Sequence, residues 1–178
     1  MTFAQKLQMG KTGESIIAKW MNRRGFSVLP VYEIEQGKFK GPALYSVNAQ
    51  LIAPDMLAFT PDGQARWIEA KTKSAFTWHR KSGTWQTGIN LRHYLDYLKV
   101  QDLSPWPIVL MFLQLPGQAK DSPEGCPTGL FGDPLNVLRY NEHHRHEAED
   151  PHMVYWNYDK LTFLAPLAEV LPIDTPSL

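Results

Sequence analysis

The N-terminal part of the chain has a hydrophobic pattern that predicts a helix followed by a strand. Apolar residues recur at helical spacing over residues 16–21, Thr12 is suited to cap the helix, and Gly25 follows as a stop signal. Residues 26–32 are mainly apolar and predict a strand. Residues 35–50 contain glycine and proline and predict a loop.

A β-hairpin is predicted next. Residues 56–60 and 65–71 are its arms, and Pro61-Asp62-Gly63 between them favours a three-residue turn with the glycine in the left-handed conformation. This turn places Thr60 opposite Gln64. A two-residue turn would shift the register by one position and move every side chain to the other face.

The predicted register brings four positions together near the open end of the hairpin. Asp55 falls opposite Glu69, and Ala53 falls opposite Lys71. Glu69 and Lys71 share a face because side chains alternate along a strand. Cross-strand partners lie close together, so Asp55 and Glu69 are expected to be neighbours.

The next segments predict a crossover connection. Residues 72–88 are polar and aromatic and predict an exposed loop. Residues 90–101 predict a helix that ends before Pro105, and residues 107–113 form a continuous apolar run typical of a buried strand. A crossover of this kind places the last strand parallel to the second hairpin arm. The expected buried stripe of the helix is Leu91, Tyr94, Leu95 and Leu98.

The C-terminal part has weaker patterns. Residues 116–134 predict a long loop, residues 154–156 predict a strand, and Asp159 is suited to cap a short helix through Leu164. We therefore expect one α/β domain over residues 1–178. Its α-β-β-β-α-β core, a mixed sheet flanked by helices, spans about residues 10–115, and residues 116–178 form an irregular C-terminal extension.

Composition and charge narrow the class of protein. The chain has 178 residues, 43% of them hydrophobic and 20% charged, which is typical of a globular domain. It has one cysteine, Cys126, and its longest apolar run is too short to span a bilayer. We expect a cytoplasmic protein with no membrane partner. Residues 1–100 carry 14 Lys and Arg against 7 Asp and Glu, and residues 101–178 carry 4 against 11, which favours a polyanion partner.

Four residues of the predicted core are suited to phosphodiester hydrolysis: Glu14, Asp55, Glu69 and Lys71. Clustered carboxylates on rigid strands need a cation to offset their repulsion, and hard oxygen ligands suit Mg²⁺ or Mn²⁺. Such a cation lowers the pKa of bound water, and a nearby lysine offsets developing negative charge. Each residue also has a structural alternative. Glu14 would favour a helix N-terminus, Asp55 a turn, and the other two an exposed strand edge.

The motif resembles that of the PD-(D/E)XK nuclease superfamily. Pro54-Asp55 and Glu69-Ala70-Lys71 match the two halves of its signature, and Glu14 in Gly10–Glu14 resembles its helical glutamate. The predicted element order resembles the restriction-endonuclease-like core, and small Holliday-junction-resolvase-like or phage-type nucleases are the most similar members. The resemblance implies that Asp55, Glu69 and the Ala70 carbonyl bind the metal. It implies that Glu14 binds it directly or through water, and that Lys71 positions the attacking water.

A basic and aromatic segment follows the motif directly. Lysines and arginines contact phosphates, and aromatic rings stack on bases. The alternative is a solvated loop with its tryptophans packed on the domain. The candidate nucleic-acid-binding residues are Lys11, Lys73, Trp78, His79, Arg80, Lys81 and Gln101, with Arg23 and Arg24 as possible additions to the surface. The His-rich residues 141–147 lack a zinc-site spacing and predict a solvated loop.

The leading hypothesis is a metal-dependent DNA endonuclease. The first alternative is a non-catalytic nucleic-acid-binding module with a nuclease-like fold. The second is an interaction protein whose acidic C-terminal half binds a partner or mimics the charge of DNA. A branched DNA substrate would favour a homodimer with two active sites.

Overall fold

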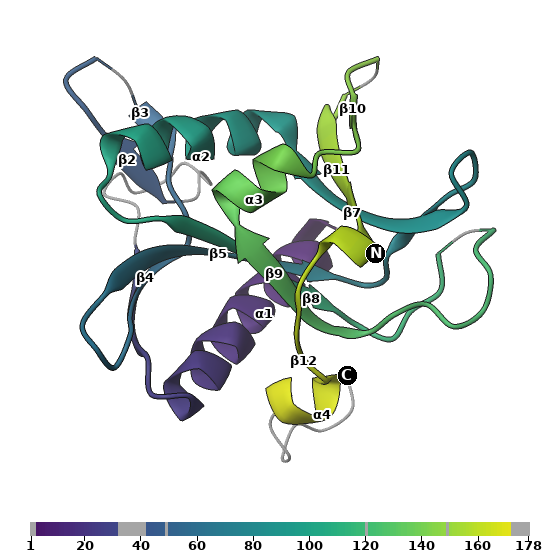
Figure 1. Ribbon diagram of the computed structural model, residues 1–178, viewed down its shortest axis with the longest axis horizontal. Helices are drawn as coiled ribbons and strands as arrows, with labels where there is room; N and C mark the ends of the chain where they lie inside the picture. The colour runs from purple at the N-terminus through teal and green to yellow at the C-terminus, as the bar shows by residue number, and fades with distance from the viewer. Residues whose placement is uncertain (1–2, 32–41, 49, 120, 149, 172–178) are drawn as a thin grey trace.

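The computed structural model describes residues 3–31, 42–48, 50–119, 121–148 and 150–171, and within these ranges no helix is long and apolar enough to cross a membrane. The elements, shown in Figure 1, are α1 (Phe3–Arg23), β1 (Ser27–Pro30), β2 (Ala43–Tyr45), β3 (Gln50–Ile52), β4 (Met56–Phe59), β5 (Ala65–Lys73), β6 (Thr77–His79), β7 (Thr84–Asn90), α2 (Leu91–Leu103), β8 (Ile108–Gln114), β9 (Gly129–Pro134), α3 (Leu135–Tyr140), β10 (His144–His146), β11 (Met153–Asn157), η1 (Tyr158–Lys160), β12 (Phe163–Ala165) and α4 (Leu167–Val170).

A mixed six-stranded sheet forms the centre of the fold, in the order β1-β4-β5-β8-β9-β12. β5 and β8 run parallel, and the other neighbours are antiparallel. The side chains of β8 alternate between two cores. Val109 and Met111 pack with α1 on one face, whereas Leu110 and Phe112 pack with α2 and α3 on the other. The mixed α/β fold with an α-β-β-β-α-β core is therefore confirmed.

The hairpin register agrees with the sequence prediction. Met56 pairs with Ile68 and Phe59 pairs with Ala65, as a three-residue turn requires. Gly63 has a φ of +84°, and the Thr60 N–H donates to the Gln64 carbonyl across the turn at 2.8 Å. Turn chemistry therefore determined which face each side chain of β5 occupies.

The prediction of an exposed loop over residues 72–88 is wrong. β5 continues to Lys73, and β6 and β7 form a second hairpin that belongs to a four-stranded sheet, β10-β11-β7-β6. Phe76 and Trp85 are buried in the core that α2 covers. The segment looked like a loop because its hairpin is completed by β11, which pairs with the other edge of β7 and lies more than 60 residues further along the chain.

The C-terminal part is more regular than predicted. β9 and β12 extend the central sheet, and β10 and β11 belong to the second sheet, so residues 116–178 are not simply an irregular extension. The predicted strand at residues 154–156 is confirmed within β11. Asp159 does not cap a helix but lies inside the 3₁₀ turn η1, and the predicted helix is replaced by β12.

Three smaller predictions also need correction. Thr12 is not a cap, because α1 begins at Phe3, although Gly25 ends the helix with a φ of +86°. Leu95 was expected in the buried stripe of α2 but is 39% exposed, and Tyr97 is buried in that stripe instead. Part of the predicted loop over residues 35–50 forms the hairpin of β2 and β3, and residues 35–41 lie outside the described residues.

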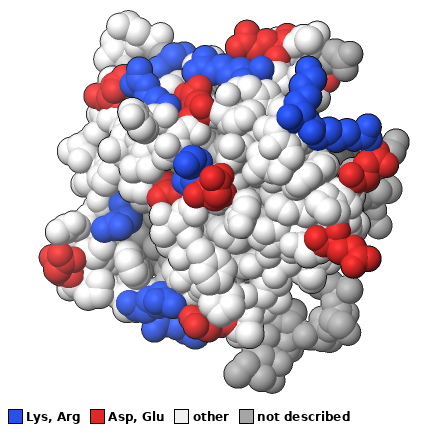
Figure 2. Space-filling view, turned by 45° about the vertical axis from the view of Figure 1, so that its right-hand side comes forward, with Lys and Arg blue, Asp and Glu red and all other residues white. Residues whose placement is uncertain are grey.

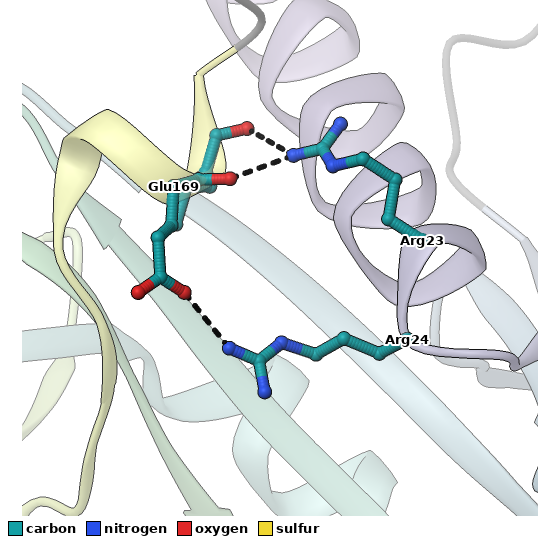
Figure 3. A network of polar contacts seen from close by, with 4 residues as sticks. Arg23, Arg24 and Glu169 are labelled. Carbon is teal, nitrogen blue, oxygen red and sulfur yellow. Dashed lines mark hydrogen bonds and ion pairs between the residues drawn. The ribbon is translucent and has the colours of Figure 1, made fainter.

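Cations from the N-terminal half pair with acids from the C-terminal half. The Arg24 guanidinium lies 2.9 Å from the Glu169 carboxylate, and Arg23 donates to the Glu169 and Val170 carbonyls, which fastens α4 to the end of α1 (Figure 3). Arg80 likewise pairs with Asp121. On the face in Figure 2, most basic groups lie beside acidic ones. The opposite charges of the two halves thus partly reflect contacts between them.

Gly13 allows α1 to approach β5. A Cβ at this position would overlap the Thr72 hydroxyl, whereas a Cβ at Gly10, one turn earlier, meets nothing within 4 Å. We expect Gly13→Ala to lower the free energy of unfolding by about 1–3 kcal/mol, because α1 or β5 must shift. Gly10→Ala, the matched control, should raise stability by up to about 1 kcal/mol. Urea unfolding measures both, and equal stabilities would contradict this close approach.

Candidate active site

The candidate site lies where β4 separates from β5. Backbone pairing of the two strands ends at Met56 and Ile68, but β5 continues to Lys73. The Asp55 carboxylate then replaces the missing backbone partner, because its Oδ2 accepts a hydrogen bond from the Ala70 N–H at 2.9 Å. The N–H and C=O of a strand residue point to the same side, so the Ala70 carbonyl also faces this open edge.

Glu69 is the most deeply buried acid of the site, at 1% exposure. Its Oε1 forms an ion pair with Lys71 Nζ, two positions along the same face of β5. Lys71 is therefore the partner of Oε1, whereas Oε2 has no hydrogen bond of ordinary geometry among the described residues, although the Tyr97 hydroxyl lies close enough to act on this carboxylate. Buried carboxylate oxygens are normally satisfied, so Glu69 Oε2 favours a further ligand.

Glu14 reaches the site from α1. It lies in the middle of a 21-residue helix, so the alternative that it favours a helix N-terminus is wrong. Burial raises the pKa of Glu14, and the nearby Asp55 carboxylate raises it further, while Lys71 and Lys11 act in the opposite direction. The helical glutamate, Asp55 and Lys71 therefore lie within electrostatic reach of one another, as predicted.

The surroundings of the site destabilise the charged form of its acids and stabilise the charged form of its lysine. Burial, followed by the negative charge of Glu69, raises the pKa of Asp55 to about 7. Burial alone would lower the pKa of Lys71, but the carboxylates of Glu69, Asp55 and Glu14 together raise it above its usual value. Lys71 is therefore protonated, and the surplus of carboxylates over cations favours a divalent ion.

The residues present fit a magnesium-type ion. Asp55 and Glu69 supply hard oxygen ligands, the Ala70 carbonyl faces the same edge, and Glu69 Oε2 has no hydrogen bond of ordinary geometry among the described residues. No three His, Cys, Asp or Glu side chains within the described ranges are grouped so as to hold a metal ion. An ion would therefore be held by few side chains and keep several waters, as is usual for Mg²⁺.

Two residues of α2, Tyr97 and His93, border the site, and His93 was missed in the sequence. Burial and then Glu69 raise the pKa of Tyr97, and burial and then Lys71 lower the pKa of His93 to about 4. The two rings are neighbours one helical turn apart, with centroids separated by 6.2 Å. The spacing of four residues between them predicts a helix, but it does not predict which part of the sheet the helix packs on.

Two predicted nucleic-acid-binding residues make contacts within the fold. Gln101 accepts a hydrogen bond from the Ile108 N–H at 3.3 Å, so it joins the end of α2 to the start of β8. Trp78 packs edge-to-face on Trp85, with ring centroids 5.0 Å apart. These contacts favour the structural alternative for both residues.

The remaining candidates lie nearer to the site or in the turn after β6. Lys11 acts on Glu14 from the same helix, and burial together with Lys71 lowers the pKa of Lys73 to about 8. His79 ends β6, and Arg80 and Lys81 follow it in an exposed turn. Their contacts with nucleic acid remain predictions.

The raised pKa of Asp55 predicts a pH effect on stability. In the folded protein Asp55 ionises near pH 7, whereas its unperturbed value is 3.8, so the folded state loses stability as the pH rises through this window. Asp55→Asn removes the loss. We expect its stability relative to wild type to increase by about 1–3 kcal/mol between pH 5 and pH 8, measured by urea unfolding in EDTA. Asp102→Asn, at an exposed carboxylate, is the control, and an identical pH profile for all three proteins would contradict the assignment.

Comparisons with known proteins complete the description. No protein-family model matches the chain, and no curated protein matches its sequence. The chain is similar to the 1.6 Å structure of Archaeoglobus fulgidus Hjc, a Holliday junction resolvase from an archaeal hyperthermophile. The identity is 11%, the TM-score is 0.49, and the match covers 85% of this chain and 90% of that chain. In this chain Asp55 immediately precedes β4, and Glu69 and Lys71 lie on β5.

Proposed function

We propose that the protein is a metal-dependent DNA endonuclease of the PD-(D/E)XK type that hydrolyses phosphodiester bonds. The observation that carries the proposal is the buried Glu69, paired with the charged Lys71 through Oε1 and without a hydrogen bond of ordinary geometry at Oε2, beside Asp55 at the open edge of β5. A structural ion pair would not require a second and a third carboxylate within electrostatic reach.

Each residue of the site has a role in this proposal. Asp55, Glu69 and the Ala70 carbonyl hold Mg²⁺ or Mn²⁺, which when bound supplies a more acidic water and charge stabilisation at the phosphate. Glu14 adds a ligand directly or through water. Lys71 is protonated, so it acts by holding the attacking water and by offsetting the negative charge that develops on the phosphate. The hydrogen bond from Ala70 orients Asp55.

The motif is most similar to resolvase-like and phage-type members of the superfamily, so branched DNA is the first structured substrate to test. A homodimer would present two active sites to the symmetric positions of a four-way junction.

Cleavage should depend on both the metal and the proposed residues. We would incubate the protein with plasmid, linear duplex and a labelled four-way junction in Mg²⁺, Mn²⁺ or EDTA. Wild type should cleave at least one of these only with metal, and Asp55→Asn and Lys71→Gln should each lower the rate by about 100-fold or more. Asp102→Asn, distant in sequence and exposed, should cleave at the wild-type rate. Cleavage by Asp55→Asn at the wild-type rate would show that the assignment of the site is wrong.

Metal binding distinguishes this proposal from a non-catalytic nucleic-acid-binding module. Mg²⁺ at about 100 times its Kd should stabilise the wild type by about 3 kcal/mol, because the ion binds only the folded state. Asp55→Asn should show little of this effect in the same thermal unfolding experiment. Equal stabilisation of both proteins, or of neither, together with salt-sensitive DNA binding, would favour the binding module.

A further inference from the structure

His79 meets two histidines that lie more than 60 residues further along the chain, and the three come from the two edge strands of the second sheet or their ends. His79 ends β6, whereas His143 and His144 lie at the start of β10. The ring centroid of His79 is 5.4 Å from that of His143 and 5.0 Å from that of His144, and the last two rings are 5.1 Å apart. Part of the His-rich segment is therefore a strand rather than the solvated loop that its sequence predicts.

Surrounding side chains hold the three rings in place. Gln86 on β7 is 2% exposed, and its Nε2 lies 3.1 Å from His143 Nδ1 and donates to Asn157 at 2.7 Å. The Ser82 hydroxyl lies 2.6 Å from His79 Nδ1. The Tyr155 ring stacks on His144 at 4.9 Å, with an interplanar angle of 11°.

The contact between His143 and His144 depends on protonation. Their Nδ1 atoms are 2.8 Å apart, which requires one nitrogen to donate and the other to accept. Burial lowers the pKa of His144, and the neighbouring His143, His79 and His146 lower it further. Protonating all the rings at once is unfavourable unless an anion lies among them.

The charged groups around the cluster include two acids that already have partners. Asp121 pairs with Arg80, and Glu142 accepts from Tyr94 and pairs with Arg145. Lys81 lies exposed in the turn after β6. Crowded imidazoles repel one another when they are protonated, so the ligand that this cluster favours is an anion. The hairpin that carries His79 also follows directly from β5, which carries Glu69 and Lys71.

We propose that His79, His143 and His144 form a second contact surface for the phosphodiester backbone of DNA, and that DNA binds there with uptake of protons. The inference rests on the proposed function and adds a regulation by pH to it. A phosphate between the rings offsets their mutual repulsion, so bound DNA favours protonated rings, and by linkage a lower pH favours bound DNA. Uptake of one proton corresponds to about a tenfold change in Kd per pH unit.

The test uses the Asp55→Asn background in EDTA, which prevents cleavage, removes the titration of Asp55 and excludes bridging cations. The Kd for a fluorescent DNA duplex is measured at pH 8, 7 and 6 at constant ionic strength. We expect the Kd to fall about tenfold or more from pH 8 to pH 6. In His143→Gln/His144→Gln and in His79→Gln the change should be less than about threefold, whereas His152→Gln, outside the cluster, should behave like the parent.

The outcomes separate this inference from the proposed function. Absence of DNA binding in every protein at every pH overturns the proposed function. Two results overturn only the proton-linked surface. In the first, the histidine variants bind DNA with the same pH dependence as the parent. In the second, they lose the same factor of affinity at every pH. Thermal unfolding at pH 8 confirms that each variant is folded, and His79→Gln, in an edge strand, provides the same test if the double variant does not fold.

Discussion

The hydrogen bond from the Ala70 N–H to the Asp55 carboxylate is the contact on which the candidate site depends. It lies where the backbone pairing of β4 and β5 ends, and it substitutes a side chain for a backbone carbonyl. A longer β4 would have paired with the remaining edge of β5 and occupied the Ala70 backbone. Because β4 ends here, β5 retains an open edge beside Glu69 and Lys71, and Glu14 on α1 comes within electrostatic reach of it.

The same arrangement buries several charged groups close together, which is electrostatically unfavourable. Three carboxylates share one lysine, and burial, followed by the neighbouring carboxylates, raises the pKa values of Glu14 and Asp55. Burying charged groups is costly even when they are paired, so this arrangement is poor evidence for a purely stabilising role. The cost is tolerated because the surrounding strands are anchored by two apolar cores, one on each face of the central sheet. A bound cation would relieve this unfavourable interaction directly.

The C-terminal part completes the structure in two ways. It supplies β9 and β12 to the central sheet and β10 and β11 to the second sheet, so neither sheet is complete with the first 115 residues alone. It also supplies acids, such as Glu169 and Asp121, that pair with arginines of the N-terminal half. The charge difference between the halves is therefore an internal complementarity as well as a possible guide to partners.

The sequence by itself determined the local geometry of the site. Pro61-Asp62-Gly63 specified the turn, the turn specified the register, and the register placed Asp55 beside Glu69. Such information is local, because turn chemistry and strand alternation act over a few residues. The apolar run of β8 and its crossover helix were predictable for the same reason.

Only the tertiary structure decided the features that depend on distant partners. The segment after β5 forms a hairpin whose second strand, β7, also pairs with β11, and the polar pattern of the segment gives no sign of that distant partner. Tyr97 and His93 border the site because α2 crosses this face of β5, and Thr12 is interior because α1 begins earlier than its capping pattern indicated. The three histidines meet for a comparable reason. Long-range pairing and packing bring His79 next to His143 and His144, and no spacing along the chain predicts that contact.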